Sequence, residues 1–120
     1  MPLPKHWKPI SEYNKDYFQA RVAYWAEKLI PDWNVGIRVK KLNEDSIAQC
    51  ECTREELTAI ITLNGFQAED LAEKDYDLTA FHEVLHVVCD DILEHLETNY
   101  NVDITGRLIH TLIHRLEKVL

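Results

Sequence analysis

Residues 81–88 read Phe-His-Glu-Val-Leu-His-Val-Val, and this stretch decides the fold. Two histidines four residues apart lie on one face of a helix, one turn from each other. That separation allows His82 and His86 to bind one zinc ion, while Glu83 can reach a water molecule on the metal. If residues 81–88 form a helix beside an accessible cleft, the pattern predicts a zinc hydrolase.

The residues on either side have the spacing of a long amphipathic helix. Apolar side chains recur every three or four residues and predict a core-facing stripe of Phe81, Leu85, Val88, Ile92 and Leu96. Asp77 is the expected N-cap of this helix. His82, His86 and Cys89 lie on a face next to the stripe, at the edge of the core, where a cleft can form.

Upstream, the sequence predicts one helix and three strands. The helix covers residues 11–30. Alternation of apolar and polar residues predicts strands at 33–41, 48–52 and 58–63. Short connections between them favour an antiparallel meander. With a last helix capped by Asp103 or Thr105, residues 1–120 are expected to form one α+β domain. It has an N-terminal helix, a three-stranded, mainly antiparallel sheet, the helix that carries residues 81–88, and a C-terminal helix.

The net charge and the hydropathy of the chain limit the classes of partner and the compartment that we expect. The formal net charge is −8, with 21 Asp and Glu against 13 Lys and Arg. This balance argues against nucleic acid and anionic membrane partners, because both attract a basic surface. No apolar run approaches the roughly 20 residues of a membrane span, and no apolar segment of a signal peptide follows the N-terminus. We therefore expect a cytoplasmic protein with reduced thiols.

The cysteine spacing adds one further candidate. Cys50-Glu51-Cys52 has the form of half a metal site, but the chain has no second such pair to complete a zinc knuckle. Alternate cysteines on one face of a strand also behave as small hydrophobic residues, and we favour this interpretation.

A catalytic zinc ion needs a third protein ligand and an open position for water. Asp90 follows His86 too closely to turn back onto the same metal while the helix continues. His110 and His114 share one face of the predicted last helix. If the two helices form a hairpin near residues 98–100, both histidines lie opposite His86, and the spacing chooses neither.

Residues 81–88 resemble the active-site helix of zincin metallopeptidases. The chain as a whole resembles small, single-domain zincin-like proteins of phages and bacteria, with some similarity to SprT-like domains. Residues 33–39 and 58–63 are similar to strands that precede the active-site helix in those proteins.

This resemblance implies a zinc-dependent peptidase whose substrate lies along an exposed strand edge. It places the third ligand at His110, where the family commonly has an acidic residue. His114 is then an alternative ligand, a substrate contact or a partner of a ligand. Glu83 would take a proton from the activated water and pass it to the leaving amine.

Two other functions also fit the sequence. In one, zinc fastens the last helix to residues 81–88 in a non-catalytic structural or protein-interaction module, with four protein ligands that could include Cys89 or His114. In the other, a metal-free domain uses its acidic surface to bind a basic partner. Zinc content separates the metal-free domain from the rest, and the number of protein ligands separates the zinc module from the enzyme.

Overall fold

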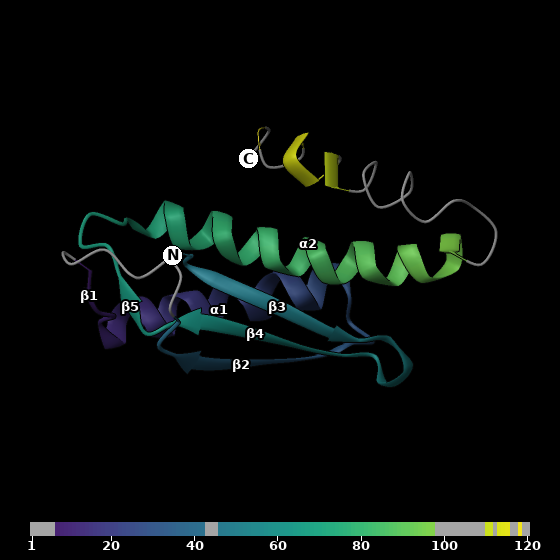
Figure 1. The fold of residues 1–120 in the computed structure, drawn as a ribbon, viewed down its shortest axis with the longest axis horizontal. Helices are drawn as coiled ribbons and strands as arrows, with labels where there is room; N and C mark the ends of the chain where they lie inside the picture. The colour runs from purple at the N-terminus through teal and green to yellow at the C-terminus, as the bar shows by residue number, and fades with distance from the viewer. Residues whose placement is uncertain (1–6, 43–45, 98–109, 112, 116–117, 119–120) are drawn as a thin grey trace.

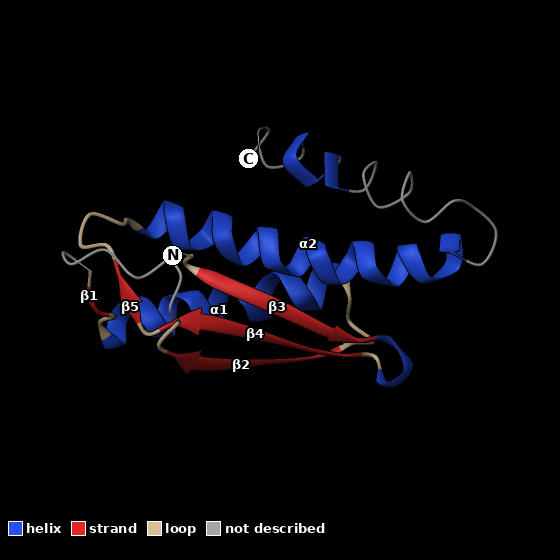
Figure 2. Ribbon diagram, viewed as in Figure 1, coloured by secondary structure: helices blue, strands red, loops and turns tan. Residues whose placement is uncertain are grey.

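A computed structural model describes residues 7–42, 46–97, 110–111, 113–115 and 118, with only the backbone described for 93–97. The fold is α+β (Figures 1 and 2). Its elements are β1 (Lys8–Pro9), α1 (Glu12–Leu29), β2 (Asn34–Lys40), β3 (Ala48–Thr53), the 3-10 helix η1 (Arg54–Glu56), β4 (Thr58–Asn64), β5 (Phe66–Gln67) and α2 (Glu73–Glu97). Residues 110–111 and 113–115 are also helical, whereas the predicted caps Asp103 and Thr105 lie outside the described residues.

Helix α1 confirms the prediction for residues 11–30 to within one residue at each end. Ser11 is its N-cap and accepts a hydrogen bond from the backbone N–H of Asn14 at 3.1 Å, which satisfies one of the amides left open at a helix start. Phe18 and Val22, one turn apart, are buried against the sheet. Proline at position 31 prevents continuation of the helix.

The three predicted strands are present, but their pairing differs from the antiparallel meander. The sheet order is β2-β4-β3, in which β3 pairs antiparallel with β4 and β2 pairs parallel with β4. The prediction of a mainly antiparallel sheet was therefore wrong, because the sheet is mixed.

Burial explains this order. Ile61, Thr62, Leu63 and Asn64 are all buried, so the second half of β4 is covered on both faces, and β4 takes the centre of the sheet. A tight connection through η1 and Leu57, which adopts the left-handed conformation at φ 51°, joins β4 to its antiparallel neighbour β3. The stretch 41–57, which includes β3, is long enough to return the chain parallel to β2.

Helix α2 buries two faces rather than the single predicted stripe. Tyr76, Ala80, Val84 and Val87 pack into the main core with the sheet and α1. A second cluster consists of Phe81, Leu85, Cys89 and Ile113, the last from the C-terminal helical residues. Of the predicted stripe, Val88 is half-buried, Ile92 is 46% exposed, and the side chain of Leu96 is not described.

The start of α2 also differs from the prediction. The helix begins at Glu73, so Asp77 lies inside it and is not the N-cap. The Asp77 carboxylate instead accepts hydrogen bonds from Arg21 Nε at 2.6 Å and Trp25 Nε1 at 3.2 Å, which tie α2 to α1. In the described part of the chain, no helix is long and apolar enough to cross a membrane.

Candidate metal centre

Four histidines gather where α2 meets the C-terminal helical residues. The Nε2 atoms of His82 and His86 are 2.9 Å apart, and those of His110 and His114 are 3.0 Å apart. Across the two helices, the ring centroids of His82 and His114 are separated by 6.2 Å, and those of His86 and His110 by 6.3 Å. The structure thus places both predicted third ligands beside the pair on α2.

The position of this histidine cluster follows from the two buried faces of α2. Successive helical residues point about 100° apart, so His82 and His86 fall between the sheet-facing side and the side that contacts Ile113. Both rings are half-buried on this border, which we call the seam and which carries His82, Glu83 and His86. His110 and His114 are exposed. The helix therefore presents its two imidazoles at the border of the core rather than within it.

Glu83 lies on the strand side of the same seam and is only 7% exposed. It lines two cavities that open along α2. One, of about 410 Å³, is also lined by Gln49, Cys50, Cys52, His86 and Asp90. The other, of about 250 Å³, is also lined by Ile47, Ala48, Leu78, Thr79 and His82. The carboxylate therefore sits between the two histidines of α2 and strand β3.

The histidine pairs come close to the spacing of zinc ligands. Two imidazoles on one tetrahedral zinc ion, at Zn–N distances of about 2.0–2.1 Å, hold their nitrogens about 3.4 Å apart. The pairs at 2.9 and 3.0 Å need to open by only a few tenths of an ångström. The ring centroids that face each other across the two helices are farther apart than the ring centroids within each pair. Within the described residues, no group of three or more His, Cys, Asp or Glu is arranged to hold a metal ion.

Cys89, the other candidate ligand from the sequence, lies away from the cavities. Its side chain is buried with Phe81, Leu85 and Ile113. Burial raises the pKa of the Cys89 thiol. Its surroundings are those of a core residue.

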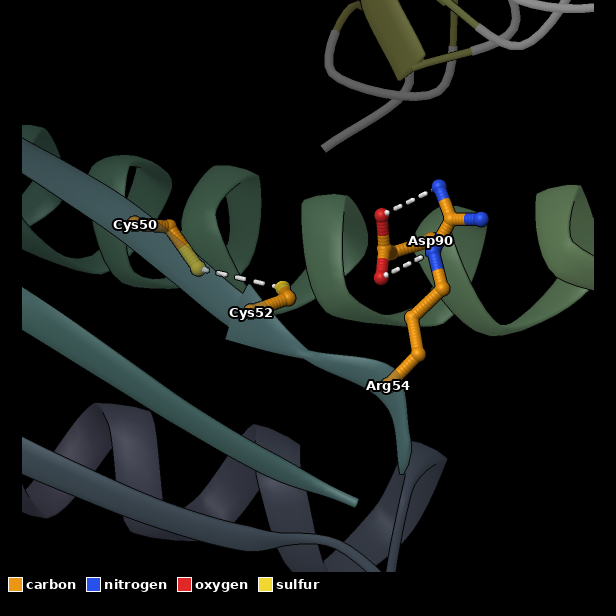
Figure 3. A network of polar contacts seen from close by, with 4 residues as sticks. All are labelled: Cys50, Cys52, Arg54 and Asp90. Atoms are coloured by element: carbon orange, nitrogen blue, oxygen red, sulfur yellow. Dashed lines mark hydrogen bonds and ion pairs between the residues drawn. The ribbon is translucent and has the colours of Figure 1, made fainter. Parts of the chain in front are cut away.

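Two features of the larger cavity could not be expected from sequence spacing alone. Asp90 accepts two hydrogen bonds from Arg54, from Nε at 2.9 Å and from Nη2 at 3.1 Å (Figure 3). This two-point ion pair joins the residue that follows β3 to α2.

The second feature is the cysteine pair of β3. The sulfur atoms of Cys50 and Cys52 face each other at 3.9 Å on the side of the strand that faces α2 (Figure 3). The hydrogen bond with Cys52, together with burial, raises the pKa of Cys50, and the same bond lowers the pKa of Cys52. The alternation in residues 48–52 placed both side chains on one face, but it did not reveal that this face lines a cavity with Glu83 and His86.

Comparison of the chain with protein-family models, with curated proteins and with solved structures gives no match.

Proposed function

We propose that this protein is a zinc-dependent, zincin-like hydrolase of peptide bonds. His82, His86 and His110 would hold the zinc ion, with His114 as the alternative third ligand, and Glu83 would act as the general base. The observation that carries the proposal is the position of Glu83: a carboxylate only 7% exposed lines cavities beside both histidines of α2. A nearly buried carboxylate in a cleft is typical of acid–base sites.

The donor set fits zinc. Imidazole nitrogens are common zinc ligands, and three of them leave one position for water. When bound, the ion would lower the pKa of a water molecule and polarise the substrate carbonyl. Glu83 would then accept a proton from that water on its carboxylate and deliver it to the nitrogen of the departing amine. Because Glu83 follows His82 directly on a rigid helix, the base and the ligand keep a fixed relation.

Strand β3 supports a peptide as the substrate. It is an edge of the three-stranded sheet, with β4 on one side, and it borders the cavity that contains Glu83 and His86. An extended peptide can add to such an edge through main-chain hydrogen bonds. The scissile carbonyl of a peptide paired with β3 would lie along the seam that holds the histidines.

The experiment compares zinc content and peptide hydrolysis in matched variants. Glu83→Gln should retain about one zinc ion per chain and lose hydrolysis of a mixed peptide library by about 100-fold or more. His82→Ala should lose both zinc and hydrolysis. Glu27→Gln, the same change at an exposed position of α1, is the control and should match the unchanged protein. Hydrolysis that survives in Glu83→Gln would remove Glu83 from the mechanism.

One observation favours a second candidate, a non-catalytic zinc-fastened structural or interaction module. His114 is as close to His82 as His110 is to His86, so four imidazoles could close the coordination sphere. X-ray absorption of the zinc-loaded protein counts these ligands. Three histidines and one oxygen favour the enzyme, whereas four histidines together with no hydrolysis favour the module.

The compartment and partners belong to the same proposal. A cytoplasmic location would keep Cys50, Cys52 and Cys89 reduced, and all three are free thiols in the structure. The formal charge of −8 favours a peptide or protein partner over nucleic acid or an anionic membrane.

A further inference from the structure

Cys50 and Cys52 differ from an ordinary pair of core cysteines. Both also contact the main core, but their side chains are half-buried and line a cavity of about 410 Å³ with the polar residues Gln49, Glu83, His86 and Asp90. Cys89 provides the contrast within the same chain, because it is buried among apolar side chains. The paired sulfurs therefore face open space that water or an ion can enter.

The separation of the two sulfurs matches that of ligands on one metal ion. Two thiolates on a tetrahedral zinc ion, at a Zn–S distance of about 2.3 Å, lie about 3.8 Å apart. The observed Sγ–Sγ distance is 3.9 Å, set by two side chains on the same face of one strand (Figure 3). Both sulfurs could therefore bind one metal ion without a change in the backbone of β3.

We propose that Cys50 and Cys52 form a second metal site, distinct from the histidines, that binds a thiophilic divalent ion such as zinc or cadmium. The two thiolates supply the protein ligands, since no group of three or more such side chains in the described residues is arranged around a metal. Asp90 lines the same cavity, where its carboxylate is paired with Arg54. Water in the cavity completes the coordination.

This second site does not depend on zinc binding by the histidines. Thiolate ligands select soft metal ions, whereas imidazoles alone give no sulfur-to-metal transition. A metal ion bound to the cysteine pair would occupy the same cavity as Glu83 and His86, so a peptide that lies along β3 would compete with it.

Cadmium ion is the probe, added to the reduced, metal-free full chain while the ultraviolet thiolate-to-cadmium band is recorded. We expect a band from two thiolates in the unchanged protein. Since loss of even an indirect partner weakens metal binding about 10–100-fold, Cys50→Ser and Cys52→Ser should each weaken cadmium binding by about 100-fold or more. Cys89→Ser is the matched control and should leave the band unchanged. His86→Ala should also retain it, because the cysteine pair is a separate site.

Three results would overturn the proposal: a band that persists in the Cys50→Ser/Cys52→Ser double variant, a band lost with Cys89→Ser, or a band lost with His86→Ala. A second measurement uses only the unchanged protein and so avoids any failure of a variant to fold. Cadmium should slow alkylation of Cys50 and Cys52 together, as followed by mass spectrometry, and leave alkylation of Cys89 unaffected. Equal rates with and without cadmium at Cys50 and Cys52 would also refute the site.

Discussion

Breaking the Arg54–Asp90 ion pair should loosen the contact between the end of β3 and α2. The guanidinium and carboxylate meet at two points, 2.9 and 3.1 Å apart, and the two side chains are 26% and 23% exposed. Exposed pairs contribute about 0.2–1 kcal/mol, whereas removing one partner of a buried pair costs about 3–5 kcal/mol. A two-point pair with three-quarters of each side chain buried falls between these limits. We expect a coupling free energy of about 2 kcal/mol.

A double-mutant cycle measures this coupling free energy. Urea unfolding of the unchanged protein, Arg54→Met, Asp90→Ala and the double variant gives four free energies of unfolding. Methionine retains the aliphatic length of arginine, and the higher helix propensity of alanine at position 90 cancels in the cycle. About 1 M NaCl should reduce the coupling only in part, because salt screens partly buried charges weakly. A coupling below about 0.5 kcal/mol, or its complete loss in salt, would refute this account of the pair.

Three further predictions concern the core and its pH dependence. Ile61→Ala should lower the free energy of unfolding by about 2–5 kcal/mol because Ile61 is fully buried, whereas Ile60→Ala at the neighbouring exposed position should cost less than about 1 kcal/mol in the same urea assay. Asn64→Ala should lower the free energy of unfolding by about 3 kcal/mol. The buried Asn64 amide accepts hydrogen bonds from the N–H groups of Leu42 and Phe66 and donates one to the Ser46 carbonyl. Asn34→Ala, at an exposed position of β2, is the control. Burial raises the pKa of Tyr76 above its unfolded value near 10, so stability is retained below pH 10 and falls as the pH rises further, by up to about 1.4 kcal/mol per pH unit. Tyr76→Phe should flatten that decline in unfolding curves measured from pH 8 to 11, and an unchanged slope would contradict it.

Local patterns in the sequence predicted the two long helices and the three long strands, but neither the short elements β1, η1 and β5 nor the strand pairing. A cap at Ser11 and a proline after residue 30 bound α1, and alternation bounds β2, β3 and β4. Alternation identifies which side chains share a face, yet it carries no information on which strand lies beside which. The order β2-β4-β3 goes with burial of the second half of β4 on both faces, which is a property of the packed molecule.

Helix α2 shows why the predicted stripe was only partly right. The prediction weighted the large side chains of Phe81 and Leu85, which form the second cluster with Ile113. The smaller Ala80 and Val84 pack into the main core. A helix covered on two sides is apolar around most of its circumference, so periodicity cannot choose the face that meets the sheet.

The candidate site, too, could be predicted only where it depends on local spacing along the chain. The spacing of His82 and His86 is local, and a helix is enough to bring their rings together. The choice between His110 and His114 depends on how two helices face each other, and the structure places them at nearly equal distances from the α2 pair. The cysteine pair was readable as a shared strand face, but the cavity it lines exists only after β3 packs against α2.

The seam along α2 holds Glu83, the one carboxylate among the buried residues that the structure describes. Glu83 lies next to Val84 and between Ala80 and Val87 on the buried side of the helix, a position where packing alone favours an apolar residue. Burying a carboxylate there opposes folding, and two half-buried imidazoles and two half-buried thiols line the same cavities. Departures from core packing that cluster at one place are typical of functional sites. The polar residues of this seam therefore support the proposal that β3, α2 and the C-terminal histidines form one functional face.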